Sequence, residues 1–159
     1  MYGDVRFYFS SGSIPDEAIV AATGGPFVHV DIDIGDGECV GALSQGIVKA
    51  SINPEAKVAI WRAQAVLARQ DLTNAETWAL AQVGHAYGWL DLANTGVADI
   101  FRRVTGQTFA PYVGVKGAWD CSAFATKFLQ IADYFAVGNL TPAQTSPVDL
   151  ANALGVTYE

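Results

Sequence analysis

Apolar and polar residues alternate along much of the N-terminal part of the chain, which is the pattern of half-buried β-strands. The clearest case is Phe27-Val28-His29-Val30-Asp31-Ile32-Asp33-Ile34. The tight turn Gly35-Asp36-Gly37 and residues 38–43 follow it, so the two segments are predicted to form a hairpin. Further strands are predicted over residues 4–9, 46–52 and 57–61.

The rest of the chain has the apolar spacing of amphipathic helices. Thr73-Asn74-Ala75-Glu76 has the form of a capping box, which predicts a helix beginning there. The apolar face of that helix is predicted to carry Leu72, Ala75, Ala79, Leu80, Val83 and Tyr87. Another helix is predicted to begin at Cys121 and end near Gly138, with the apolar stripe Phe124, Phe128, Ile131, Ala132 and Phe135.

Three shorter helices complete the predicted elements. One follows Ser11-Gly12-Ser13, has Pro15 in its first turn and ends at Gly24-Gly25. The second covers residues 97–105, and the last begins at Ser146-Pro147-Val148-Asp149. Strands followed by helices indicate an α+β fold, with an antiparallel sheet packed against helices.

The composition is that of one folded domain spanning residues 1–159. Hydrophobic residues make up 51% of the chain and charged residues 16%, which excludes disorder, and the length is enough to bury a core. No internal repeat, linker or low-complexity stretch divides the sequence. Nothing in it specifies an oligomeric state.

The net charge of −7 argues against nucleic acid or an anionic membrane surface as a partner, because both require a cationic face. No segment reaches the ~18 uninterrupted apolar residues of a membrane span. The start Met1-Tyr2-Gly3-Asp4-Val5-Arg6 lacks the basic and apolar regions of a signal peptide. We therefore expect a chain that is cytoplasmic as synthesised, unless lysis or a virion delivers it elsewhere.

Two cysteines, Cys39 and Cys121, are too few for a disulfide scaffold and lack the paired spacing of a structural zinc site. A four-ligand site would have to gather both of them with His29 and His85 from scattered elements. We therefore expect neither a metal nor another cofactor. Cys39, beside the hairpin turn, is expected to be a core residue.

Cys121 is the candidate nucleophile, because it opens a predicted helix in Trp119-Asp120-Cys121-Ser122. The helix dipole and the free backbone N–H groups favour a thiolate there, and Asp120 is the expected N-cap. His29, on a strand, is the candidate general base. The alternative for each residue taken alone is structural, since free cysteines are among the most buried residues and a strand histidine often packs.

Several segments resemble NlpC-type cysteine peptidases. The hairpin resembles their histidine hairpin, Gly84-His85-Ala86-Tyr87-Gly88-Trp89 resembles their Gly-x-x-Tyr-x-Trp segment, and Asp120-Cys121-Ser122 matches their nucleophile motif. Because the histidine precedes the cysteine here, the order resembles the circularly permuted, YiiX-like branch of the papain-like superfamily. The resemblance spans nearly the whole chain and rests on the order and spacing of these motifs.

The resemblance implies a cysteine hydrolase that cleaves amide bonds in peptides, including those of peptidoglycan. Cys121 would attack the carbonyl carbon, His29 would accept its proton and return it to the leaving group, and Tyr87 would help to hold the oxyanion. Trp89, Trp119, Asp120 and Ser122 would line the substrate groove. The alternatives are an acyl or lipid hydrolase or acyltransferase on the same fold, and a catalytically inactive binding or structural module, such as a phage component.

The third catalytic residue is the main departure from the family pattern. In the family a His or Glu lies about twelve residues after the first histidine, and counting along this hairpin places Gly41 there. Glycine has no side chain to orient an imidazole. The nearby polar residues are Asp31, Glu38, Ser44 and Gln45, and Asp31 is predicted to share a strand face with His29. A backbone carbonyl is the other option.

Overall fold

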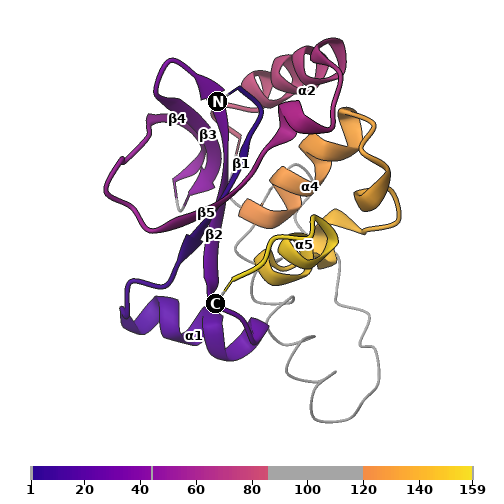
Figure 1. Ribbon diagram of the computed structural model, residues 1–159. Coiled ribbons are helices and arrows are strands. Elements are labelled where there is room, and N and C mark those ends of the chain that lie inside the picture. Colours follow the sequence, from indigo (N-terminus) through magenta and orange to yellow (C-terminus); the bar gives the residue numbers. More distant parts are fainter. Residues whose placement is uncertain (1, 44, 86–119, 159) are drawn as a thin grey trace.

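A computed structural model of the chain describes residues 2–43, 45–85 and 120–158 (Figure 1). Its strands are β1 (Val5–Phe9), β2 (Phe27–Gly35), β3 (Glu38–Leu43), β4 (Gly46–Ser51) and β5 (Val58–Trp61). Its helices are α1 (Ile14–Thr23), α2 (Arg69–Ala81), α4 (Cys121–Ile131) and α5 (Pro147–Ala153), with short 3₁₀ turns at Ala63–Ala65, Phe135–Val137 and Pro142–Gln144. The predicted α+β class is confirmed. The helix predicted over residues 97–105 lies outside the described residues.

The described strands form one antiparallel sheet in the order β4-β3-β2-β1-β5. The β2–β3 hairpin turns at Asp36, whose φ of 52° is left-handed, and it pairs Asp31 with Gly41. The outer edge of β4 is partly covered by the chain that follows α2. Ile47 donates its N–H to the carbonyl of His85 and accepts the N–H of Gly84, both at 2.9 Å.

Helices α2, α4 and α5 lie on one side of the sheet (Figure 1). The strand residues that face them are apolar, and Val5, Phe7, Val30 and Ile32 are fully buried. The Trp61 ring, on the same face as its partner Val5, lies 4.9 Å from the ring of Tyr134, which follows α4. This side of the sheet is the hydrophobic core, and alternate strand residues such as His29 and Asp31 point to the opposite, outer face. The register shift between His29 and Phe27 interrupts the alternation, so Phe27 also packs in the core.

Helix α4 runs through this core and fixes the position of Cys121. Asp120 is its N-cap and accepts the N–H of Ala123 at 2.6 Å. Phe124 and Phe128 are fully buried, and the Trp78 ring of α2 stacks on Phe124 at 5.3 Å. The predicted apolar stripe is wrong at its end, because Phe135 lies beyond the helix and is 85% exposed.

Helix α2 begins four residues before the predicted capping box. Its first residue is Arg69, and the Thr73 hydroxyl donates to the Arg69 carbonyl, one turn back within the helix. Leu72, Ala75 and Ala79 are buried as predicted, whereas Leu80 and Val83 are exposed and Tyr87 lies outside the described residues. The capping box predicted at the start of α5 is confirmed, because Ser146 and Asp149 bond each other's backbone N–H groups.

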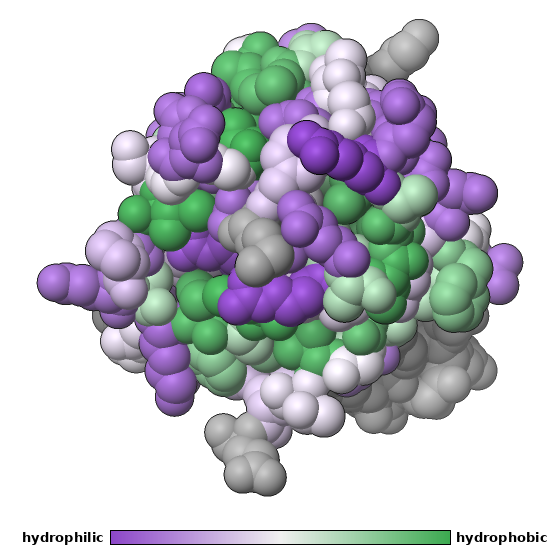
Figure 2. Space-filling model, turned by 45° about the horizontal axis from the view of Figure 1, so that its top comes forward, coloured by the Kyte–Doolittle hydropathy of each residue, from purple (hydrophilic) through white to green (hydrophobic). Residues whose placement is uncertain are grey.

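The face drawn in Figure 2 carries hydrophobic residues in several groups separated by hydrophilic ones. Among the described residues, the exposed large hydrophobic side chains are Ile60, Val66, Leu80, Val83, Phe135 and Tyr158. No helix in the described ranges is long and apolar enough to cross a bilayer.

Candidate functional site

Cys121 is the first residue of α4, as predicted, but its side chain belongs to the hydrophobic core. The residue is only 3% exposed. Burial is the main cause that raises the pKa of the thiol to about 12, and the carboxylate of Asp120 raises it further. Backbone hydrogen bonds from Val30, Ser122 and Cys121 itself lower the pKa, but by less than burial and Asp120 raise it. The lowered pKa expected at a helix N-terminus is therefore not found, because loss of hydration outweighs the helix contribution.

His29 lies on the other face of the sheet. Its neighbour Val30 points into the core and contacts Cys121 through its backbone, so the His29 side chain points to the outer face. There it packs 5.2 Å from the ring of Tyr8, its partner on β1. Cys121 packs in the core with Val30, whereas His29 lines a cavity that does not include Cys121, so the described contacts do not join the predicted nucleophile and general base.

The outer face around His29 contains a cavity of about 190 Å³. It is lined by Tyr8, His29, Asp31, Cys39, Gly41, Leu43, Val48, Ala50, Ser51 and Asn53. Burial lowers the pKa of the imidazole, and Arg6 lowers it further, while the carboxylate of Asp31 opposes them. His29 is therefore a neutral imidazole at neutral pH.

Asp31 is buried at this cavity rather than facing water. It is 4% exposed, and the Tyr8 hydroxyl donates to its Oδ2 at 2.6 Å. Nε of Arg6, also buried, lies 3.8 Å from Oδ1, and the guanidinium carbon lies 5.2 Å from the centre of the Tyr8 ring. Asp31 Oδ1 and Arg6 Nη1 have no hydrogen-bond partner among the described residues. The cavity thus borders a buried ion pair with unused hydrogen-bonding capacity.

Gly41 lies beside His29, as the count along the hairpin predicted. A Cβ at this position would lie 3.6 Å from Nε2 of His29 and 2.9 Å from Cβ of Asp31. The position that orients the imidazole in the resembling family is therefore packed against Asp31 here and cannot carry a side chain unless Asp31 shifts. Among the candidates for that role, Asp31 is near His29 and influences its pKa, but its Oδ2 accepts from Tyr8.

Glu38 does not lie beside His29. It begins β3 opposite Gly35, six residues along β2 from His29, which corresponds to about 20 Å. Its carboxylate forms an exposed ion pair with Lys49 at 2.6 Å. Gln45 is exposed beyond the end of β3, and Ser44 lies outside the described residues. The predicted orienting role thus has no support at Glu38.

Cys39 is buried, as predicted, but on the outer face at the cavity rather than in the core. Its thiol donates to the carbonyl of Ala50 at 3.5 Å. Burial, followed by the charge of Asp31, raises the pKa of this thiol to about 12. Sequence reasoning missed its place in the cavity, although two-residue periodicity puts positions 39 and 41 on one face.

The predicted groove residues divide into two groups. Asp120 and Ser122 are buried, and the Ser122 hydroxyl donates to Oδ1 of Asp120 at 3.1 Å, so both belong to the capping of α4. Tyr87, Trp89 and Trp119 lie outside the described residues, and their predicted roles stay predictions.

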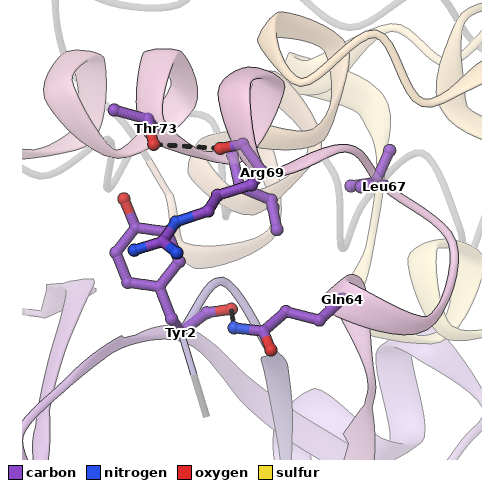
Figure 3. Close-up of a pocket in the computed structure, with 6 residues that line it drawn as sticks. Tyr2, Gln64, Leu67, Arg69 and Thr73 are labelled. Atoms are coloured by element: carbon purple, nitrogen blue, oxygen red, sulfur yellow. Dashed lines mark hydrogen bonds between the residues drawn. The ribbon is translucent and has the colours of Figure 1, made fainter.

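A larger cavity, of about 560 Å³, lies at the N-terminal end of α2 (Figure 3). It is lined by Tyr2, Gln64, Leu67, Arg69, Leu72 and Thr73. Two of its polar side chains have partners within the protein: the Tyr2 hydroxyl donates to Glu76, and the Gln64 amide donates to the backbone carbonyl of Tyr2 at 3.2 Å. It offers no buried polar atom without a partner, and the cavity beside His29 is the better candidate site.

Within residues 2–43, 45–85 and 120–158, no three His, Cys, Asp or Glu side chains gather as a metal ion would require. The chain matches no protein-family model, and no curated protein resembles it significantly.

Proposed function

We propose that the chain is a binding module with a permuted papain-like architecture, and that Cys121 does not act as a nucleophile in it. The observation that carries this proposal is the separation of Cys121 and His29 by the sheet. A thiol that is 3% exposed, with a pKa of about 12 and with its predicted base His29 on the outer face of β2, lacks both ionisation and that base.

The binding site in this proposal is the cavity beside His29. It joins apolar walls, such as Leu43 and Val48, to a few polar groups, and that combination is typical of ligand sites. The resemblance to NlpC-type proteins suggests a peptide or peptidoglycan-like ligand. The function proposed is therefore recognition of such a ligand without its cleavage.

A cysteine hydrolase is the second candidate function. Its substrates would be amide bonds or, alternatively, acyl or lipid esters. The observation in its favour is that Cys121 begins an α-helix of 11 residues, behind the N-cap Asp120. This candidate requires a base other than His29, and it requires the substrate to reach the buried sulfur of Cys121. It therefore needs two further assumptions that the binding module does not need.

The two candidates are distinguished by incubating the protein of residues 1–159 with muropeptides and with phospholipid vesicles. We expect muropeptides to bind, with no new amino groups and no fatty acid released. Cys121→Ser is expected to bind as the unchanged chain does, and His29→Ala to bind more weakly. Release of amino groups that disappears in Cys121→Ser would overturn the binding-module proposal and establish the hydrolase.

A further inference from the structure

We propose that β5 is the interface of a homodimer, in which it pairs antiparallel with β5 of a second copy across a two-fold axis. The two sheets then continue into each other as one sheet. The inference concerns assembly and does not depend on the proposed binding function. It follows from the direction of the β5 backbone groups, from the open edge that they form and from the side chains that meet across the axis.

The ladder between β1 and β5 determines which backbone groups of β5 point outward. The Phe9 N–H donates to the Lys57 carbonyl at 3.1 Å, so these two residues form a hydrogen-bonded pair. Hydrogen-bonded and non-hydrogen-bonded pairs alternate along an antiparallel ladder, so Ala59 also bonds to β1. The N–H and C=O groups of Val58 and Ile60 therefore point away from the sheet.

This outer side of β5 is the open edge of the sheet. At the other edge, Ile47 of β4 exchanges hydrogen bonds with Gly84 and His85. In the ranges that the structure describes, no residue bonds to the outward backbone groups of Val58 and Ile60. Such unpaired groups are a template for pairing with another chain.

One two-fold register uses every outward group of β5. When Val58 lies opposite the partner's Ile60, Ile60 also lies opposite the partner's Val58, and both pairs are hydrogen-bonded. A register that places Val58 opposite the partner's Val58, or Ile60 opposite the partner's Ile60, forms only one such pair within the strands. In the favoured register Ala59 lies on the axis, opposite the partner's Ala59.

The side chains that meet in this register are compatible. Val58 and Ile60 lie on the outer face of the sheet, and Ile60 is 39% exposed. Opposite the partner's Val58 it forms an apolar cross-strand pair, which occurs twice in the dimer. No residue of β5 is charged, and the flanking Lys57 lies opposite the partner's Trp61 rather than another cation.

The occupant of this edge is a second copy because β5 is complementary to itself. A two-fold interface repeats each favourable contact, whereas an extended peptide would meet the same short edge only once. The axis is perpendicular to the joined sheet, so the outer faces of both copies lie on one side. The cavities beside His29 would then open on the same face of the dimer.

The first test measures the molar mass of the protein of residues 1–159 by sedimentation equilibrium. We expect a monomer–dimer equilibrium that shifts toward the dimer as the salt concentration rises, because each copy has a net charge of −7 and salt screens the repulsion. A protein that stays monomeric at millimolar concentration in both low and high salt would overturn the inference. A monomer in which added muropeptides shift the amide resonances of Val58 and Ile60 would assign the edge to a peptide instead.

Ile60→Lys places a charge at the interface and removes both apolar pairs, so it should raise the dimer dissociation constant at least about tenfold. Val83→Lys is the matched control. Val83 is 42% exposed but precedes Gly84 at the β4 edge, so this variant should dimerise as the unchanged protein does. Circular dichroism checks that both variants fold. An unchanged dissociation constant in Ile60→Lys, or an equal loss in Val83→Lys, would contradict the inference.

Single cysteines test the register, also if Ile60→Lys does not fold. Across the axis the two Ala59 Cα atoms would lie about 4.5 Å apart, which allows a disulfide, whereas the two Val58 Cα atoms would exceed the ~7 Å limit. Ala59→Cys should therefore give a disulfide-linked dimer on a non-reducing gel after mild oxidation, and Val58→Cys should not. The unchanged protein is the blank, since Cys39 and Cys121 are buried. Cross-linking of Val58→Cys alone, or of neither variant, would overturn the proposed pairing.

Discussion

At the scale of single residues, the direction of each side chain on β2 decides its chemistry. His29 and Val30 are neighbours in sequence, yet one lines the cavity on the outer face and the other packs in the core. The motif Asp120-Cys121-Ser122 and the strand histidine were both recognisable from the sequence. Their separation was not, because it depends on which face of the strand meets α4.

Cysteine reactivity gives a direct measurement. With pKa values of about 12, Cys39 and Cys121 are each thiolate at only about one part in 10⁵ at pH 7. We expect iodoacetamide to label both slowly in the folded chain and quickly in urea, as followed by mass spectrometry. His29→Ala should leave the rate at Cys121 unchanged. Fast labelling of Cys121 at pH 6 that is lost in His29→Ala would instead establish a catalytic pair.

His29 should also make stability depend on pH. Burial lowers its pKa in the folded chain, whereas the unfolded chain has the ordinary value of about 6.5. As the pH falls below about 6.5, the unfolded chain binds the proton first, so the free energy of unfolding decreases until the folded pKa is reached. Urea unfolding at pH 7.5 and pH 5 should show a larger loss for the unchanged chain than for His29→Gln. Equal losses would mean that the buried imidazole does not titrate abnormally.

At the scale of elements, local signals predicted most boundaries because short-range physics sets them. Ser13 and Ser146 cap α1 and α5, and Gly24 ends α1 in the left-handed conformation. The predicted start of α2 failed, because Thr73-Asn74-Ala75-Glu76 fits a capping box but also fits a helix interior. Packing of Leu72 against Gly3 favours the earlier start, and this contact between distant segments is invisible in a local motif.

Capping of α4 is expected to matter more than capping of α1. Oδ1 of the buried Asp120 accepts the Ala123 N–H at 2.6 Å, whereas the exposed Ser13 accepts the Asp16 N–H at 3.3 Å. Asp120→Ala should lower the free energy of unfolding by about 2 kcal/mol and Ser13→Ala by about 0.5 kcal/mol, since α4 lies in the core. Chemical denaturation of both variants checks this order, and equal losses would contradict it.

At the scale of the whole molecule, the coarse architecture followed from the sequence and the placement of the site did not. Alternating apolar residues predicted the strands, and their hairpin spacing predicted the β2–β3 pairing. The layer arrangement, with α2, α4 and α5 on one side of the sheet, arises from contacts such as Trp61 with Tyr134. No spacing rule specifies such contacts, and they are what separates His29 from Cys121.

Two phenylalanines test this layer arrangement. Phe128 of α4 is fully buried in the core beneath the sheet. Phe135, seven residues later and beyond the end of the helix, is 85% exposed. Phe128→Ala should lower the free energy of unfolding by about 3–5 kcal/mol through the cavity that it leaves, and Phe135→Ala should change it by less than about 0.5 kcal/mol. A large loss at Phe135 would show that its ring is covered in solution, for instance by another copy of the chain.

The two-sided strand β2 also has a consequence for evolution. Val30 and Ile32 pack in the core, while His29 and Asp31 line the cavity on the other face of the strand. Under the proposed binding function, a substitution at the cavity leaves the core packing of Val30 and Ile32 in place, so selection can change the two faces largely separately. If the proposed binding function holds, substitutions at alternate positions of the strand would change the bound ligand while the apolar interior of the domain stays the same.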